Sequence, residues 1–138
     1  MNTTGTKLRL MLAIGNTGRK DDGLGWAFAQ KLEQSQVVGW QVEYRYQLQI
    51  EDAELMSHFT EVLIVDAAKD EHQAPFFIEP CQAGKDITFS THALGPSTIL
   101  GLCIDMYDTH PKVHILGIVG HEWKLELGLS PEAENNLR

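Results

Sequence analysis

The sequence predicts an α/β fold in which a mostly parallel β-sheet carries helices on both faces. Apolar, strand-like segments at residues 7–14, 62–66 and 113–119 alternate with segments of helical periodicity. Strands that alternate with helices are typical of parallel sheets covered on both sides. No internal repeat, low-complexity block or linker interrupts the 138 residues, which predicts a single domain over 1–138.

The first apolar segment, residues 7–14, predicts a buried strand that ends in a Gly-Asn turn. A helical pattern begins at Asp22 and places four apolar residues on one face, namely Leu24, Ala27, Phe28 and Leu32. We expect Asp21 or Asp22 to cap this helix, because a carboxylate at a helix start accepts free backbone N–H groups and suits the helix dipole.

The middle of the chain predicts an edge strand, a short helix and a second buried strand. Residues 37–49 alternate between apolar and polar side chains, which predicts a strand with one solvated face near a sheet edge. An acidic helix is expected over 51–59 and a buried strand over 62–66, ended by Asp66. Residues 67–74 are expected to form a polar loop.

The second half predicts two further strands and two helices. Phe76–Ile78 is a short strand closed by Pro80, and residues 85–96 form a loop. Pro96 begins a helix to about Tyr107 with five side chains inward, namely Ile99, Leu100, Cys103, Ile104 and Tyr107. Residues 113–119 form the last strand. Ser130, followed by Pro131 and early acids, predicts a capped helix in the tail.

Charge and cysteine content exclude several classes of protein. The chain has 19 acidic and 11 basic residues, a net charge of −8, and no Lys/Arg cluster, whereas a nucleic-acid-binding protein needs a basic face. Cys81 and Cys103 are too few for a disulfide framework or a four-thiolate metal site, so we expect two buried or half-buried free thiols. The polar N-terminus and the interrupted apolar run after it predict neither a signal peptide nor a membrane span, and the expected location is the cytoplasm.

Acidic side chains and one imidazole are expected at the same edge of the predicted sheet. Asp21 and Asp22 follow the first strand, Asp66 ends another, and His92 precedes the helix that begins at Pro96. Polar side chains at the C-terminal ends of strands in an open α/β sheet project into the ligand crevice. Asp22, Asp66 and His92 therefore form a candidate three-ligand set for a divalent ion such as Zn, Ni or Mn, with positions left for water or substrate.

Each of these residues also has a simpler explanation. Asp21 and Asp22 suit a solvated turn and helix cap. Asp66 can accept hydrogen bonds from backbone N–H groups of the next turn, which would satisfy a partly desolvated carboxylate. Most histidines occupy surface or packing positions. A dinucleotide site is disfavoured, because the glycines do not fit G-x-G-x-x-G and two adjacent carboxylates would repel a pyrophosphate.

Three motifs, in this order along the chain, resemble those of a known family. Segment 14–25, IGNTGRKDDGLG, is similar to an opening pattern of a strand, Gly-Asn, a spacer and Asp-Asp/Glu-Gly. Segment 63–68, LIVDAA, is similar to an aliphatic strand ending in Asp-Ala, and segment 90–94, STHAL, to a Ser/Thr-His segment before a helix. Segments 116–118, LGI, and 128–132, GLSPE, add to the likeness. The family is the hydrogenase maturation endopeptidases, which process the large subunit of nickel–iron hydrogenases.

The resemblance implies a three-layer α/β/α sandwich with a mostly parallel, twisted five-stranded sheet. It implies an endopeptidase that removes the C-terminal extension of the large-subunit precursor after nickel insertion. The residues that match the family's nickel-contacting set are Asp22, Asp66 and His92. The nickel is supplied by the precursor, and a surrogate divalent metal is expected to bind the same site. Gly15 and Asn16 are expected to shape the turn that carries Asp22, and Asp21 to support it.

The chain departs from the family pattern at two places, and a second class of function stays open. Gly18, followed by Arg19 and Lys20, stands where a bulky apolar residue is common, and segment 119–122, VGHE, stands where Gln-Pro or Glu-Pro often occurs. The alternatives are a non-catalytic, chaperone-like module that binds a hydrogenase subunit, or a small metal-binding regulator. A pure docking protein would not need three ligands on one edge. A monomer is the favoured oligomeric state.

Overall fold

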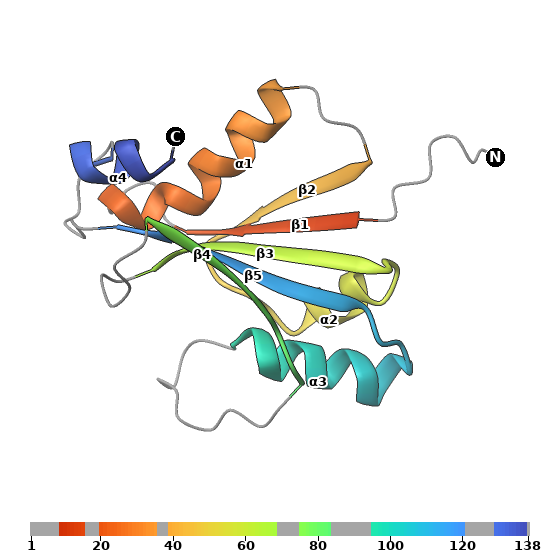
Figure 1. Cartoon of the computed structure of the whole chain (residues 1–138). Helices are drawn as coiled ribbons and strands as arrows, with labels where there is room; N and C mark the ends of the chain where they lie inside the picture. The colour runs from red at the N-terminus through yellow and green to blue at the C-terminus, as the bar shows by residue number, and fades with distance from the viewer. Residues whose placement is uncertain are drawn as a thin grey trace.

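The structure, a computed structural model, describes residues 9–15, 20–35, 39–68, 75–83, 95–120 and 129–137, without the side chains of Lys20 and Asp22. These residues form one five-stranded sheet with the strand order β2-β1-β3-β5-β4 (Figure 1). Four strands run parallel and β4 pairs with β5 in the antiparallel sense. The strands are β1 (Arg9–Ile14), β2 (Trp40–Arg45), β3 (Glu61–Ala68), β4 (Phe76–Pro80) and β5 (Lys112–Val119).

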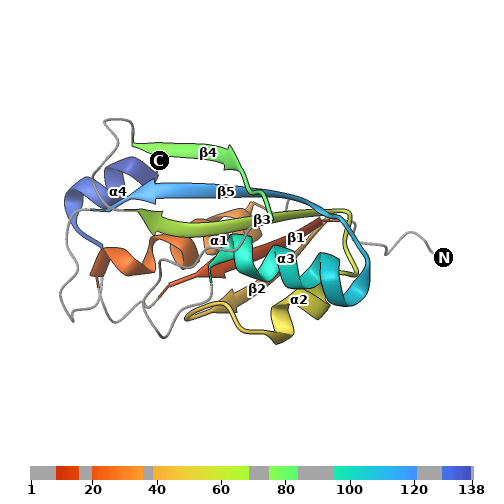
Figure 2. The same cartoon turned by 90° about the horizontal axis from the view of Figure 1, so that it is seen from below.

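Helices cover both faces of the sheet. In Figure 1, α1 and α4 lie above the sheet and α2 and α3 below it, and Figure 2 shows α2 and α3 in front of the strands. The helical elements are the 3-10 helix η1 (Lys20–Gly23), α1 (Leu24–Gln34), α2 (Glu51–Met56), α3 (Pro96–Tyr107) and α4 (Pro131–Leu137). The predicted α/β fold, a three-layer sandwich with a mostly parallel five-stranded sheet, is confirmed.

The sheet separates two hydrophobic cores. Along β1, Leu10 and Leu12 belong to the core beneath α2 and α3, whereas Met11 and Ala13 belong to the core beneath α1 and α4. All four side chains are at most 1% exposed. Side chains alternate between the faces of a strand, so a strand covered on both faces is apolar at every position. This explains the uninterrupted apolar segment in the sequence.

The predicted strand over 37–49 is an edge strand, but it is shorter and less solvated than expected. β2 lies at one end of the strand order and spans Trp40–Arg45, and all six of its residues are half-buried. Its polar face is partly covered because Arg45 Nε donates to Asp52 Oδ1 of α2 at 3.1 Å. Asp52 also accepts from the backbone N–H of Gln49 at 2.8 Å, and it is almost fully buried.

Two further expectations need correction. β3 continues to Ala68, so residues 67 and 68 belong to the strand rather than to a loop, and Asp66 lies within the strand. Tyr107 is not inward: it is 38% exposed, because α3 ends there and Asp108 turns the chain with a positive φ of 53°. The bounds of α3 are as predicted, and both cysteines are free thiols, Cys103 buried and Cys81 half-buried.

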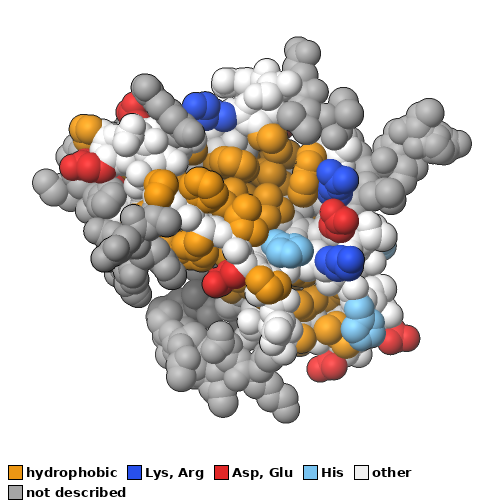
Figure 3. All heavy atoms as spheres, viewed as in Figure 1, with side chains coloured by type: hydrophobic (Ala, Val, Ile, Leu, Met, Phe, Trp, Pro, Cys, Tyr) orange, Lys and Arg blue, Asp and Glu red, His pale blue; other side chains and the backbone are white. Residues whose placement is uncertain are grey.

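The outer surface is apolar on one side. Figure 3 shows hydrophobic side chains gathered over the face between α1 and β4. Phe76 and Ile78 of β4 are 50% and 59% exposed. Within the described ranges, the helices are all too short or too polar to cross a lipid bilayer.

Candidate functional site

Asp66 lies near the C-terminal end of the central strand β3. It shares a face with Val62 and Ile64, both of which belong to the core beneath α2 and α3. Unlike these two buried residues, Asp66 is half-buried, and its Oδ1 accepts a hydrogen bond from the backbone N–H of Ala67 at 2.7 Å. The sequence suggested backbone N–H groups of a following turn as donors to Asp66, whereas the donor seen here, Ala67, is the next residue of the same strand. The Asp66 side chain is half-buried and so remains partly accessible.

A glycine and an aromatic ring flank Asp66 within the sheet. Gly117 of β5 pairs with Asp66 on one side and with Phe77 of β4 on the other. A Cβ at Gly117 would lie 2.3 Å from the Phe77 ring, so the ring occupies the space above the glycine. The absence of a side chain at position 117 therefore lets an apolar ring lie one strand away from the carboxylate.

The strand order places η1 near the carboxyl ends of β1 and β3. From β1 the chain crosses to β2 on one side, and β3 then pairs with β1 on the other side. The crevice outside the carboxyl ends of strands at such a switch point is the usual ligand site of an open α/β sheet. η1 follows β1 at this point, and it contacts β3. The backbone of Asp21 and Asp22 is thereby carried to the edge where Asp66 lies.

Asp21 is a buried link between η1 and the C-terminal helix. Its side chain has no exposed surface; Oδ1 accepts from the Ser130 backbone N–H at 2.7 Å and Oδ2 from the Ser130 hydroxyl at 2.6 Å. Ser130 Oγ in turn accepts from the Ala133 N–H at 3.1 Å, which caps α4 as the sequence predicts. A buried carboxylate needs such partners. Asp21 therefore fixes η1 to the start of α4.

The prediction that Asp21 caps the first helix is wrong. The N-cap of α1 is Gly23, with no side-chain cap hydrogen bond. The oxygens of Asp21 are directed to α4 instead. Sequence reasoning identified Ser130 as a cap but missed its second role as the partner of Asp21, because the two residues are 109 positions apart.

A close contact at Gly25 sets the position of η1 and α1. A Cβ at this residue would lie 2.5 Å from the carbonyl oxygen of Ile14 and 2.7 Å from that of Val65. Both atoms are backbone atoms, one at the end of β1 and one within β3, so no side chain can move aside. Only glycine allows α1 to start this close to the sheet. The glycine requirement was not foreseen, although Gly25 belongs to the first motif.

The first motif is also tied to the neighbouring strand. Gly15 is buried, has a φ of 154°, and donates its N–H to the carbonyl oxygen of Arg45 at 2.9 Å. Trp26 Nε1 donates to the same oxygen at 3.0 Å, which joins the first turn of α1 to the end of β2. Asn16, the other residue expected to shape this turn, lies outside the described residues.

Of the three predicted metal ligands, the side chain of Asp66 alone is described. The backbone of Asp22 lies in η1, but its side chain is outside the description, and so is His92. Among the described side chains, no group of three or more His, Cys, Asp or Glu residues could hold an ion. The set of Asp22, Asp66 and His92 stays a prediction, as does nickel.

The surroundings of the two cysteines indicate whether either thiol can act as a nucleophile. Burial raises the pKa of the Cys81 thiol, and the charge of Glu79 raises it further, although a hydrogen bond with Ser97 lowers it. A raised pKa keeps the thiol protonated near neutral pH, whereas a catalytic cysteine needs the thiolate. Cys103 is fully buried. Neither thiol is placed as a nucleophile.

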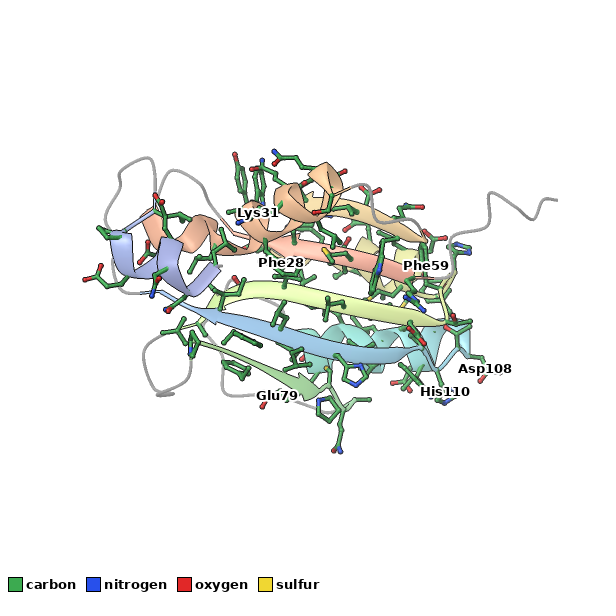
Figure 4. All side chains as sticks on the ribbon, turned by 45° about the horizontal axis from the view of Figure 1, so that its top comes forward. Phe28, Lys31, Phe59, Glu79, Asp108 and His110 are labelled. Carbon is green, nitrogen blue, oxygen red and sulfur yellow. The ribbon has the colours of Figure 1, made fainter. Side chains whose placement is uncertain are left out.

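The opposite end of the sheet carries a separate cavity. In Figure 4, Phe59 and His110 mark the end where β3 and β5 begin. A cavity of about 550 Å³ lies there and is lined by residues 57–61 and 109–112. Asp66 lies near the other end of β3, so this cavity is not part of the candidate site.

Structural comparison shows which known proteins share this architecture. The chain is similar to the hydrogenase maturating endopeptidase HybD from Escherichia coli, with a TM-score of 0.74 and 21% identity over 94% of this chain and 84% of that one. It is similar to the [NiFe] hydrogenase maturation protease HybD from Thermococcus kodakarensis, with a TM-score of 0.66 and 24% identity over 94% and 90% of the two chains. For HycI from Thermococcus kodakarensis the TM-score is 0.73, with 19% identity over 97% and 87%.

These likenesses establish the fold. Neither a protein-family model nor a curated protein matches the sequence. The chain nevertheless shares its fold with hydrogenase maturation endopeptidases over almost its whole length. The resemblance that the three motifs indicate thus extends to the fold.

Proposed function

We propose that this chain is an endopeptidase that removes the C-terminal extension of a nickel–iron hydrogenase large-subunit precursor after nickel insertion. The observation that carries the proposal is the position of Asp66, a half-buried carboxylate at the switch point of a sheet shared with hydrogenase maturation proteases. The motif order in the sequence supports the same activity. The described contacts of Gly15, Asp21 and Gly25 support it further, because they hold η1 at this edge.

The nickel of the precursor is the recognition element in this proposal. Asp22, Asp66 and His92 complete its coordination, and the ion belongs to the substrate rather than to the enzyme. Two carboxylates and one imidazole suit a divalent first-row metal and leave positions for substrate atoms. In the free enzyme the same three side chains would hold a surrogate divalent metal.

The reaction is hydrolysis of one peptide bond. Water adds to the carbonyl carbon, the C–N bond breaks, and the new amine leaves with a proton. An ion held beside the scissile bond assists by polarising the carbonyl or by lowering the pKa of the attacking water. The three ligands hold the precursor so that the bond lies next to the ion, and this positioning lowers the barrier further. Gly15, Asn16 and Asp21 support the segment that carries Asp22.

The bulk properties fit this role. A net charge of −8 disfavours nucleic acid as a partner. We place the protein in the cytoplasm as a monomer, where it meets the folded precursor.

A processing assay tests the proposal. Purified precursor, either nickel-loaded or nickel-free, is incubated with the protein, and the large subunit is followed by its electrophoretic mobility and intact mass. We expect the nickel-loaded precursor alone to lose its C-terminal extension. Cleavage without nickel would contradict metal-dependent recognition. A stable complex with no cleavage in either form would show a docking module instead of a protease.

A further inference from the structure

The outer edge of β4 has no strand beside it among the residues that the structure describes. Within the described part of the chain, β4 pairs only with β5. Val119 N–H donates to Pro75 O at 3.0 Å and Cys81 N–H donates to Val113 O at 2.8 Å. Hydrogen-bonded and non-bonded pairs alternate in antiparallel strands. The odd-numbered residues of β4 therefore direct their backbone N–H and C=O groups toward β5. Phe76 and Ile78 therefore direct their N–H and C=O groups outward.

The same two residues expose apolar side chains. Phe76 is 50% and Ile78 is 59% exposed. They pair with Ile118 and Leu116, which belong to the core beneath α1 and α4, so they continue this core onto the surface. The apolar area between α1 and β4 in Figure 3 lies on this face. An exposed hydrophobic edge invites strand pairing and is usually protected when it has no partner.

The outer edge of β4 lies within reach of Asp66 for a bound peptide. Gly117 pairs with both Asp66 and Phe77, so Phe77 lies two strands, roughly 10 Å, from the carboxylate. A strand added outside β4 would lie roughly 14 Å from Asp66 at the same level of the sheet. About five extended residues cover this distance. A peptide bound along β4 can therefore continue to the candidate site.

We propose that β4 binds an extended segment of the large-subunit precursor by strand addition and so directs the scissile bond to Asp66. The inference rests on the proposed function and adds to it the mode of substrate binding. Main-chain bonds to Phe76 and Ile78 supply affinity, and alternate apolar side chains of the segment pack on these two residues. Pro80 has no N–H and limits the row of donors at the far end.

Charge favours a substrate segment over a second copy of this chain. Figure 4 shows Glu79 on β4 at the border of the sheet, and it is exposed. Pairing two β4 strands would bring together two chains that each carry a net charge of −8. A segment with a basic residue beside Glu79 avoids this repulsion.

Amide hydrogen exchange tests the proposal on the unmodified protein. The probe is a synthetic peptide that covers the C-terminal segment of the precursor, extension included. We expect the peptide to slow exchange at the amides of Phe76 and Ile78. The amides of Phe77 and Glu79 already face β5 and should change less. Binding of the peptide without protection at Phe76 and Ile78 would overturn strand addition.

Variants separate this inference from the proposed function. Ile78→Pro removes one outward N–H and Ile78→Lys removes the apolar contact, whereas Met106→Lys changes an equally exposed residue, 58% exposed, on α3. We expect the two Ile78 variants to raise KM for the precursor at least about tenfold with kcat largely kept. Met106→Lys should match the wild type.

The experiments distinguish a failure of strand addition from a failure of the proposed function. If the wild type processes the precursor and both Ile78 variants do so with an unchanged KM, strand addition is wrong and the protease function stands. If the wild type neither cleaves the precursor nor protects Phe76 and Ile78, both proposals fail. A wild-type dimer that Ile78→Lys dissociates, in sedimentation measurements, would assign this edge to self-association and overturn the inference.

Discussion

Asp21 and Asp66 are two carboxylates at the same edge of one sheet, and the fold uses them differently. Asp21 has no exposed surface, and Ser130 donates to both of its oxygens. Asp66 is half-buried, and its bond with the Ala67 N–H engages one oxygen. A buried, fully paired carboxylate stabilises a junction, whereas a partly accessible one can meet a substrate. Burial, more than residue type, therefore separates the structural acid from the candidate ligand.

Removing the charge of Asp66 is expected to have the largest effect. Asp66→Asn keeps an oxygen for the Ala67 N–H but loses the anionic ligand, so processing of nickel-loaded precursor should fall roughly 100-fold or more. Urea unfolding should change little. Asp22→Ala and His92→Ala are expected to lose processing as well. Normal processing by all three variants would remove the basis of the protease proposal.

Changing Gly25 is expected to displace the segment that carries both Asp21 and Asp22. In Gly25→Ala the new Cβ meets two backbone oxygens, of Ile14 and Val65, that cannot move aside. We expect a loss of about 2–3 kcal/mol in the free energy of unfolding, measured with urea, and reduced processing. A loss well under about 1 kcal/mol would mean that the helix start shifts freely and does not define the site.

Two substitutions at Asp21 test whether this carboxylate is structural. Asp21→Ala leaves the N–H and hydroxyl of Ser130 without their acceptor, and should cost about 2 kcal/mol of stability. Asp21→Asn keeps an acceptor for the N–H and should cost less. For both variants we expect processing to follow the folded fraction. A fully stable but inactive Asp21→Asn protein would show instead that Asp21 acts at the site directly.

The smallest expected effect concerns Cys81. Its pKa is raised mainly by burial, so the protonated thiol is favoured in the folded state. This contribution to stability is complete below the pKa of the unfolded thiol and is lost as the pH rises through the folded value. Alkylation with iodoacetamide should therefore have a midpoint at higher pH than for an exposed cysteine. Cys81→Ser should process the precursor normally; an inactive variant would point to a thiol mechanism.

Local patterns predicted most of the fold, and long-range contacts account for what they missed. The apolar segments located the strands, and Pro96 marked the start of α3, because periodicity and proline geometry act over a few residues. The bond between Asp21 and Ser130 joins distant segments and leaves no local pattern. The close approach at Gly25 likewise depends on how α1 meets the backbone of Ile14 in β1 and of Val65 in β3.

The candidate site was predicted from the positions of its residues along the expected strands and from the sequence motifs. Asp66 could be placed at the C-terminal edge because it follows an aliphatic run, although the strand extends two residues further. The two-residue extension arises because Ala67 and Ala68 pair with Ile118 and Val119 of β5, which the sequence of β3 alone does not reveal.

We propose that Asp22, Asp66 and His92 bind one divalent ion together. Isothermal titration of the free protein with Co²⁺, a surrogate for the nickel of the precursor, tests it most directly. We expect saturable binding to the wild type that Asp22→Ala, Asp66→Ala and His92→Ala each abolish, while Cys81→Ser retains it. Wild-type affinity in any one of the three ligand variants would contradict a shared ion.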